Sequence, residues 1–536
     1  MRILLLALVL LLPLAAYLFY PLQSDEFKIV ENAKLLETKA AYLGREVPQL
    51  SDTMRRPNVL WIMADDLGYY DTDLYSAEGY VETPNIRRIA EGGVKFTNAY
   101  VTSPLCSPSR ASVLTGRYNQ RFGFEHQLHD RYLRNRMEYY GFKYIIDSRP
   151  WDPQYKTEVP SADFMEQMGL PRSEVTAAEI FRKHGYRTGL TGKWHVTKSQ
   201  DNAPTDFGFD EFYGFYSSHS LYSPEGTDGI VDVHNDKDWT DDYIWSGQRN
   251  GRQAIQRNGK IITEERYLTT AITDESIAFV ESAGKDQPFF LFASYNAPHT
   301  PFQAPSAYME KYSDEEDIVK QVYYAMIKCL DDEIGRLLDH LEAKGLLEHT
   351  IIGFVSDNGG AAYTFATDNQ GLKGGKITNF EGGVKVPMIM SGPGLPGDTE
   401  YNFPTSATDL LVTTLAMTDI DLPSDRIYDG ADLTTFVQQG EPAHDYIYFR
   451  KGYNYGIRSL DHKMTWNSWT QRDTLLFELG IDPYERQNKF QSSREITQAL
   501  MAAYESWDQQ MMVPQWPSVI HFNFTDGDGT IYPFEN

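Results

Sequence analysis

The chain has 536 residues, of which 41% are hydrophobic and 13% aromatic, enough for one large domain and a smaller one. Its formal net charge of -26 argues against nucleic acid as a partner, because phosphate binding needs a basic face. A polyanionic ligand remains compatible with this acidity, since an acidic protein can carry a local basic pocket.

The N-terminus, MRILLLALVLLLPLAAYLFYPLQSDE, has one basic residue followed by an unbroken apolar run from Ile3 to Tyr20. Such a segment is typical of an export signal. Because the run is long and lacks a clear cleavage site, residues 1–22 are predicted to be either a cleaved signal peptide or a retained membrane anchor. Both alternatives place the rest of the chain in the periplasm or outside the cell.

Short apolar runs that end in polar clusters recur along the chain. They are PNVLWIMADDLG, YRTGLTGKWH, PFFLFASYNAPHTP, TIIGFVSDNGG and VKVPMIMSGPG. Helical patterns between them cover Pro84–Gly92, Thr176–His184, Leu268–Ala283 and Asp314–Gly345. The alternation predicts an α/β fold with a mainly parallel mixed sheet covered by helices on both faces. Ligands bind beyond the carboxyl ends of such strands, so the polar clusters are expected to form one site.

The pattern changes after about Gly440. Aromatic and polar residues alternate in DYIYFRKGYNYGIRSLDHKMTWNS, and a helical segment follows from about Ser493 to Gln509. We therefore predict a catalytic domain over residues 55–440 and a smaller α+β subdomain with an antiparallel sheet over residues 441–536.

Two adjacent pairs of oxygen ligands, Asp65 with Asp66 and Asp357 with Asn358, follow two of the apolar runs. Either pair alone is explained by a turn after a strand. Together they favour a hard cation, calcium or magnesium. Positive charge and proton carriers come from Lys193, His195, His299 and Lys376, with Lys373 as a competitor for Lys376. This set suits an anionic group that is held and cleaved.

One of the two cysteines lies in SPLCSPSRASVLTG. Pro108 suits the first turn of a helix and Gly116 its end, so Cys106 is expected at a helix N-terminus, where an anion is favoured. A thiolate nucleophile is the first chemical interpretation, although a soft ligand fits poorly among hard oxygens. Cys329 lies in a helical pattern and is predicted to be a buried core residue, with pairing to Cys106 left open.

The segment CSPSRASVLTGR resembles the type I sulfatase signature, C-x-P-S-R followed by L-T-G-R. The resemblance extends through TGKWH, GFDEFYG, NAPHTPF, FVSDNGG and GGKITNFEGGVKVP to TLLFELGIDPYERQN, and covers nearly all of the chain after about residue 55. It implies an alkaline-phosphatase-like α/β fold. It also implies that a dedicated maturation enzyme oxidises Cys106 to formylglycine.

The resemblance further implies a role for each matching position. Asp65, Asp66, Asp357 and Asn358 match the ligands of one calcium ion, together with the modified Cys106; Arg110 matches the residue that steadies the formylglycine; Lys193 and Lys376 match the lysines that grip the sulfate; His195 and His299 match the catalytic histidines. The implied reaction is hydrolysis of sulfate esters through a formylglycine gem-diol nucleophile, with a sulfated polysaccharide or oligosaccharide as substrate. Two alternatives stay open: a phosphonate monoester or phosphodiester hydrolase, and a non-catalytic sulfoglycan-binding protein.

Substrate contacts are expected from less specific segments. Arg131–Lys156 is rich in arginine and aromatic residues, which suits either a sulfated sugar or a solvated insertion. His234–Trp245 is a candidate rim, and His219 a candidate substrate contact. Residues 236–242 are acidic enough for a second calcium site but lack EF-hand spacing.

Overall fold

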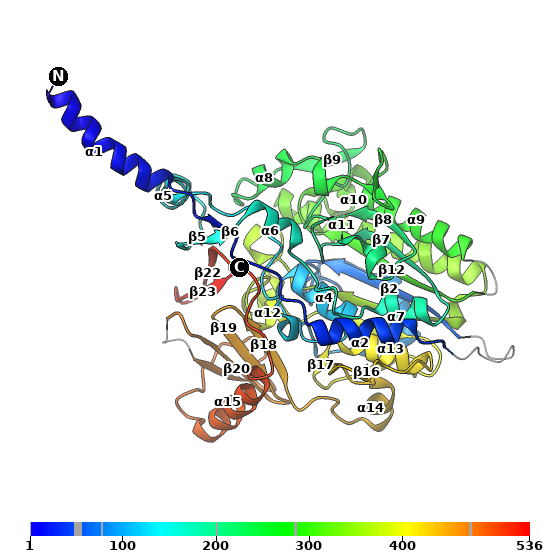
Figure 1. Cartoon of the computed structure of the whole chain (residues 1–536). Helices are drawn as coiled ribbons and strands as arrows, with labels where there is room; N and C mark the ends of the chain where they lie inside the picture. Colours follow the sequence, from blue (N-terminus) through cyan, green and yellow to red (C-terminus); the bar gives the residue numbers. More distant parts are fainter. Residues whose placement is uncertain (1, 48–55, 77–78, 200–201, 284–286, 471–473) are drawn as a thin grey trace.

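A ten-stranded sheet forms the centre of the computed structural model, which describes residues 2–47, 56–76, 79–199, 202–283, 287–470 and 474–536 (Figure 1). Its neighbouring parallel strands are β8 (Glu211–Phe215), β7 (Arg187–Lys193), β12 (Phe289–Pro298), β2 (Asn58–Asp65) and β14 (Thr350–Ser356). The mainly parallel sheet is thereby confirmed.

The fifth predicted run forms β15 (Met388–Ser391), which pairs antiparallel with β14. The connection between these two strands begins and ends at the same edge of the sheet, so it does not cross a face of the sheet as a helical crossover would. This connection contains Lys376. The sheet continues through β3 (Gly93–Phe96) to β16 (Thr399–Tyr401), and at its other edge through β10 (Gln256–Arg257) to β11 (Lys260–Ile261).

Helices cover both faces of the sheet, as predicted. Alternate residues of β2 point to opposite faces, so Trp61 and Met63 join one core and Leu60 and Ile62 the other. The first core includes residues of α4 (Cys106–Thr115), α7 (Ala177–Lys183) and α13 (Asp409–Met417); the second includes residues of α3 (Pro84–Glu91), α9 (Leu268–Ser282) and α11 (Ile318–Ala343).

Helix α11 begins later than the predicted residue 314, because the side chain of Asp317 accepts a hydrogen bond from the backbone N–H of Val319 and caps the helix there. Cys329 is buried on α11, and both Cys329 and Cys106 are free thiols.

The C-terminal part contains the predicted antiparallel sheet and helix. Strands β18 (Ile447–Lys451), β19 (Asn454–Arg458), β20 (His462–Asn467) and β21 (Leu475–Glu478) pair in that order. Helix α15 (Arg494–Asp508) packs on this sheet, with the Trp507 ring stacked on Tyr448 at a centroid distance of 4.9 Å.

The last two strands pair elsewhere. β22 (Ile520–Thr525) lies between β23 (Ile531–Glu535) and β5 (Trp151–Pro153), and β5 belongs to the arginine-rich segment. Strands β22 and β23 of the predicted 441–536 subdomain therefore share a sheet with β5, which belongs to the predicted catalytic domain. The predicted start of that domain, residue 55, lies outside the described residues.

Helix α1 (Arg2–Phe19) extends away from the rest of the chain (Figure 1). Near its C-terminal end, the Arg136 guanidinium of α5 (Arg136–Tyr144) lies 4.5 Å from the centroid of the Tyr17 ring. A search of the described residues finds no helix with the length and apolar character needed to cross a membrane. Residue 1 of the predicted signal or anchor lies outside the described residues.

Candidate active site

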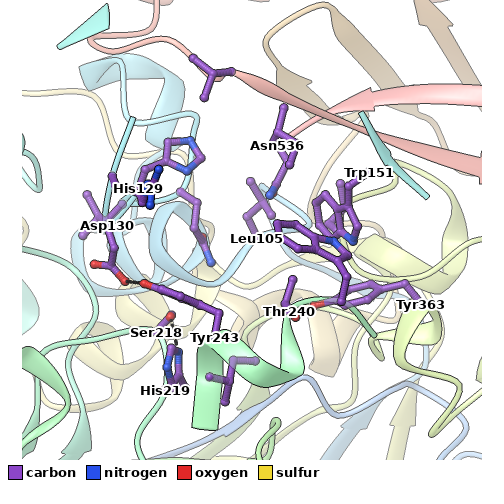
Figure 2. Close-up of a pocket in the computed structure, with 18 of the residues that line it drawn as sticks. Leu105, His129, Asp130, Trp151, Ser218, His219, Thr240, Tyr243, Tyr363 and Asn536 are labelled. Carbon is purple, nitrogen blue, oxygen red and sulfur yellow. Dashed lines mark hydrogen bonds between the residues drawn. The ribbon is translucent and has the colours of Figure 1, made fainter. Parts of the chain in front are cut away.

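A cavity of about 490 Å³ lies beside His299 and Thr300, which directly follow the carboxyl end of β12. Figure 2 shows side chains that line this cavity. His299 and Lys376 from the predicted site line it, together with aromatic side chains that include Trp151 and Tyr363. The location agrees with the general position of ligand sites in parallel α/β sheets.

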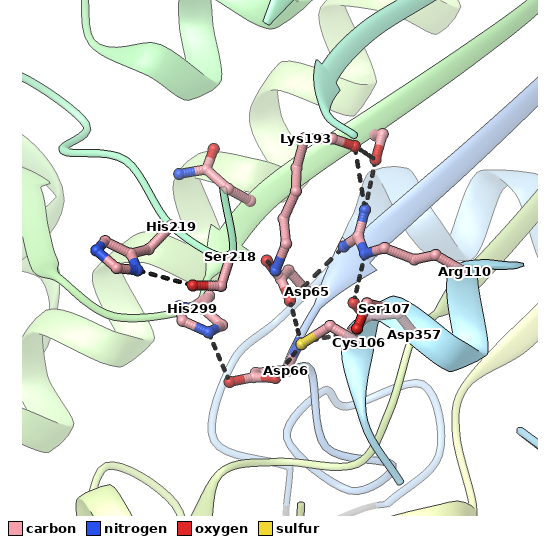
Figure 3. Close-up of polar contacts among 12 residues, drawn as sticks. Asp65, Asp66, Cys106, Ser107, Arg110, Lys193, Ser218, His219, His299 and Asp357 are labelled. Atoms are coloured by element: carbon pink, nitrogen blue, oxygen red, sulfur yellow. Dashed lines mark hydrogen bonds and ion pairs between the residues drawn. The ribbon is translucent and has the colours of Figure 1, made fainter. Parts of the chain in front are cut away.

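Four adjacent strands deliver the polar residues to one place. β2 ends at Asp65 and is followed by Asp66, β7 ends at Lys193, His299 follows β12, and Asp357 follows β14. Since these strands are neighbours in the order β7, β12, β2, β14, the side chains meet at one edge of the sheet (Figure 3).

Cys106 is the first residue of α4, and Gly116 ends that helix in the left-handed conformation, with φ +65°. The Cys106 Sγ lies 3.5 Å from Asp65 Oδ1 and 3.8 Å from Asp66 Oδ1. Burial, followed by the Asp357 carboxylate, raises the pKa of the Cys106 thiol above its usual range. The simple thiolate interpretation therefore does not fit this environment.

Arg110 binds carboxylates around Cys106. Its Nε donates to Asp357 Oδ2 at 2.7 Å and its Nη1 to Ser294 Oγ at 2.6 Å, while Nη2 lies 3.6 Å from Asp65 Oδ1. Arg110 is fully buried, so these contacts fix the orientation of both carboxylates. Ser294 had no signal in the sequence, because a serine inside an apolar strand carries no motif.

The predicted calcium ligands form a buried oxygen-rich cluster. Ligand atoms of Asp65, Asp66, Cys106 and His299 lie within 4.8 Å of one another. The Oδ1 atom of the fully buried Asn358 has no hydrogen-bond partner, while its Nδ2 donates to Asp66 Oδ1 at 2.7 Å. An unpartnered buried oxygen is costly unless a ligand binds it. The donor set therefore fits a hard cation.

The two predicted sulfate-binding lysines are buried in this cluster. Lys193 Nζ lies 2.5 Å from Asp65 Oδ2, and Lys376 Nζ lies 2.7 Å from Asp66 Oδ1. Burial alone would raise the pKa of Asp66, but Lys376, His299 and Lys193 together hold it below its usual range. Lys373 lies apart, paired with Asp526 at 2.5 Å, so Lys376 is the lysine of the site.

The two histidines have different surroundings. His299 Nδ1 donates to the carbonyl oxygen of Thr300 at 2.5 Å, which leaves Nε2 directed toward Asp66 Oδ2 at 3.6 Å. Burial and then Lys376 lower the pKa of His299 to about 3. Neither ring nitrogen of the buried His195 has a partner among the described residues, and its backbone has φ +49°. Buried polar atoms are usually hydrogen-bonded, so the two unpaired nitrogens mark His195 as a functional candidate.

His219 lies on another wall of the same cavity. Its Nδ1 is 2.9 Å from Ser218 Oγ and its Nε2 is 2.8 Å from Gln253 Nε2. The imidazole lines the cavity, as a substrate contact would, but is outside the oxygen-rich cluster.

The arginine-rich segment Arg131–Lys156 supplies mainly an apolar wall. Arg134 pairs with Glu138 at 2.5 Å and Arg149 pairs with Asp147 at 2.7 Å. The segment's cavity-lining residues are Arg131, Tyr132, Leu133, Phe142, Ile146, Trp151 and Pro153.

The rim segment His234–Trp245 also reaches the cavity, through Trp239, Thr240, Tyr243 and Ile244. A second calcium site within residues 236–242 is not supported. Asp238 Oδ1 accepts a hydrogen bond from the Thr240 backbone, and Asp241 Oδ1 accepts one from Trp245 Nε1. In the described part of the chain, these carboxylates are not among the grouped side chains that could hold a metal ion.

Comparison with known proteins agrees with this geometry. The family model described as Sulfatase matches residues 57–420. The chain belongs to the sulfatase family. It is accordingly a sulfuric ester hydrolase of the alkaline-phosphatase-like superfamily. Human N-acetylgalactosamine-6-sulfatase is 29% identical over 501 residues, which cover 86% of this chain and 87% of the human protein.

Solved structures share the fold of this sulfatase. A structure titled Ps i-CgsB in complex with k-i-k-neocarrahexaose superposes with a TM-score of 0.72 and 29% identity, covering 86% of this chain and 95% of that one. PsFucS1 sulfatase from Pseudoalteromonas sp. has a TM-score of 0.63 at 23% identity, covering 93% and 99% of the two chains, and supports the fold alone.

Proposed function

We propose that this sulfatase hydrolyses sulfate esters of a sulfated polysaccharide or oligosaccharide, using Cys106 after its oxidation to formylglycine and one calcium ion. The observation that carries the substrate class is the cavity of about 490 Å³ beside His299 and Lys376, because it is far larger than a sulfate group needs. Similar proteins are named as an N-acetylgalactosamine-6-sulfatase and as a protein complexed with a neocarrahexaose.

The cation would be held by the oxygen atoms of Asp65, Asp66, Asp357 and Asn358, with residue 106 as a further ligand. When bound there, calcium supplies positive charge that favours an anionic sulfate beside it. In the structure, Lys193 and Lys376 pair with the carboxylates of Asp65 and Asp66. When calcium and the substrate are bound, their ammonium groups would bind the sulfate oxygens instead.

Each remaining residue has a distinct part in proton transfer. One hydroxyl of the hydrated formylglycine at position 106 would attack sulfur, so that a sulfate ester of residue 106 forms as the bond from sulfur to the alcohol breaks; the second hydroxyl would later lose its proton, which expels sulfate and restores the aldehyde. His299 lines the cavity and donates the proton on its Nε2 to the oxygen of the leaving alcohol. The negative charge of the bound sulfate favours the imidazolium form of His299 that carries this proton. The unpartnered nitrogens of His195 accept a proton from residue 106 as sulfate leaves.

Two partners follow from this proposal. A maturation enzyme must oxidise Cys106, and we expect this before the chain folds because the side chain is fully buried in the folded protein. The apolar N-terminal run supports export to the periplasm or the extracellular space, with membrane anchoring through that run as the alternative to cleavage.

The test is to produce the chain with and without a formylglycine-generating enzyme. Mass spectrometry of the peptide that contains residue 106 measures its conversion. Release of sulfate from defined sulfated oligosaccharides should rise with that conversion, and Cys106→Ala should release none. Full activity with an unmodified thiol would contradict the mechanism, and a preference for phosphonate monoesters or phosphodiesters would contradict the substrate class.

A further inference from the structure

The cavity beside the sulfate site has two chemically different walls. Figure 2 shows Asp130, Ser218, His219 and Tyr243 on one side, and the aromatic side chains of Trp151 and Tyr363 on the other. A pocket of this kind suits a ligand with both apolar faces and hydrogen-bonding edges.

Asp130 is held on the polar wall by two hydrogen bonds. Its Oδ2 accepts from the Tyr243 hydroxyl at 2.8 Å and its Oδ1 from Arg252 Nη2 at 2.9 Å, with Lys198 Nζ 3.8 Å away. Burial alone would raise the pKa of Asp130, but Lys198 and Arg252 outweigh that effect and hold it below its usual range. The carboxylate is therefore ionised at neutral pH.

This carboxylate has unused capacity to accept hydrogen bonds. An ionised carboxylate offers about four lone-pair sites, and the Tyr243 and Arg252 donors occupy two of them. The Asp130 side chain is 28% exposed and lines the cavity, so a bound ligand can reach it. Arg252 also pairs with Glu166 at 2.7 Å, but Glu166 is not among the residues that line the cavity.

The opposite wall presents aromatic rings and one free donor. The Trp151 and Tyr363 ring centroids are 5.4 Å apart. Trp151 is 8% exposed, and its indole N–H has no hydrogen-bond partner among the described residues. The aromatic wall suits the apolar face of a sugar ring, while the buried indole N–H suits an oxygen of that ring or of its substituents.

We propose that Asp130 is a specificity-determining residue that accepts a hydrogen bond from a free hydroxyl of a sugar ring packed against Trp151 and Tyr363. This inference rests on the proposed glycan substrate. It further specifies that the sugar carries a free hydroxyl, and neither a sulfate nor a carboxylate, at the position facing Asp130. Either anionic group would lie within hydrogen-bond distance of the Asp130 carboxylate, and the two like charges would repel each other. The site therefore selects for the pattern of substitution on the sugar as well as for the sulfate ester.

The test compares two kinds of substrate. Fully matured wild-type enzyme and Asp130→Asn are assayed on 4-nitrophenyl sulfate, which has no sugar hydroxyls, and on sulfated oligosaccharides prepared from carrageenan and from chondroitin sulfate. The measured quantity is kcat/KM on the best saccharide divided by kcat/KM on the aryl sulfate. We expect this ratio to fall about tenfold in Asp130→Asn and about 10–100-fold in Asp130→Ala.

Glu166→Gln is the matched control, because Glu166 pairs with the same Arg252 but does not line the cavity. Its ratio should equal that of the wild type. An unchanged ratio in both Asp130 variants, or an equal fall in Glu166→Gln, would overturn the role of Asp130 alone. Wild-type enzyme that hydrolyses the aryl sulfate but none of the saccharides would overturn the proposed substrate class, and this inference with it.

Discussion

Lys451 Nζ donates a hydrogen bond to the carbonyl oxygen of Ile377 at 2.6 Å. Lys451 lies at the end of β18 in the C-terminal sheet, whereas Ile377 directly follows Lys376 of the active site. Ile377 is β-branched and has φ +83°, a backbone conformation that such residues strongly disfavour. The C-terminal sheet therefore stabilises the strained backbone that positions Lys376.

Removing this contact should impair turnover. We expect Lys451→Met to lower both kcat and kcat/KM at least about tenfold on any sulfate ester, because the backbone after Lys376 relaxes toward a less strained conformation. Glycine tolerates positive φ, so Ile377→Gly placed in the Lys451→Met background should recover part of the lost kcat. Steady-state kinetics of the single and double variants measures both effects.

Lys39 offers a control for the general cost of losing a buried lysine. Its ammonium group donates to the carbonyl oxygens of Arg172 and Glu174 and pairs with Glu179 at 2.6 Å, and these residues do not line the cavity. Lys39→Met should reduce stability while kcat stays close to wild type. If Lys39→Met lowered kcat as much as Lys451→Met, the loss would be a consequence of destabilisation and not of positioning Lys376.

Calcium should stabilise the folded protein through the four oxygen ligands. After chelation, calcium added at 100 times its dissociation constant should raise the free energy of unfolding by about 2.7 kcal/mol. At the same calcium concentration, Asp357→Asn should gain less stability than the wild type, because a neutral oxygen balances the cation less well and the affinity for calcium falls. Thermal or denaturant unfolding with and without calcium provides the measurement.

Asp238→Asn provides the comparison for the acidic segment at residues 236–242. The Asp238 carboxylate accepts hydrogen bonds from Thr240, so we expect the calcium response of this variant to match wild type. A calcium response that survived in Asp357→Asn but disappeared in Asp238→Asn would place the ion at the wrong end of the cavity for the proposed reaction.

Much of the fold follows from local sequence patterns. Apolar runs that end in polar clusters predicted the strands that end at or directly before Asp65, Lys193, His299 and Asp357, because a buried parallel strand needs a continuous apolar run. The start of α11 was predicted too early, since the side chain of Asp317 caps that helix and decides its first turn.

Long-range contacts were beyond such patterns. Nothing near Trp151 in the sequence indicates that β5 pairs with β22. Trp151 lies opposite Phe522 in this pairing, although the two residues are about 370 positions apart in the chain. Ser294, Asp130 and Lys451 were missed for the same reason, because each acquires its role from a partner on another element. Residue type alone left Lys373 as a competitor of Lys376, and only the family resemblance favoured Lys376; the fold shows that the Lys376 ammonium group reaches Asp66 while Lys373 pairs with Asp526.

Stability should depend on pH through His444. Its Nε2 lies 2.8 Å from Asp409 Oδ1, and the Asp409 carboxylate outweighs the effect of burial and raises the pKa of His444 above 6.5. A raised pKa means that this contribution is fully present below the unfolded-state pKa of about 6.5 and is lost as pH rises through the folded-state value.

The free energy of unfolding of the wild type minus that of His444→Gln should therefore decrease as pH rises from about 6 upward. Denaturant titrations of both proteins at several pH values measure this difference. His349→Gln changes an exposed histidine and serves as the control. A difference that is constant over this pH range would refute the role of the ion pair.

The two active-site histidines should respond differently to the quality of the leaving group. His299 lines the cavity where the alcohol departs, so on a sugar sulfate, whose alcohol is a poor leaving group, His299→Ala should lower kcat/KM by about 10²–10⁴-fold. On an aryl sulfate, whose phenolate leaves without a proton, the loss should be much smaller. In the proposed mechanism, His195 accepts a proton only after the alcohol has gone.

His195→Ala should therefore slow the steady state of both substrates to a similar extent and produce a burst of alcohol release, since the first step stays intact while sulfate release becomes slow. Rapid-mixing kinetics of both variants on both substrates separates the two steps. The surrounding charges, Lys193 and Lys376, are the same in the two variants, so a difference between them reports the proton transfers. Equal losses of His299→Ala on good and poor leaving groups, under conditions where chemistry limits the rate, would rule out its role as the acid.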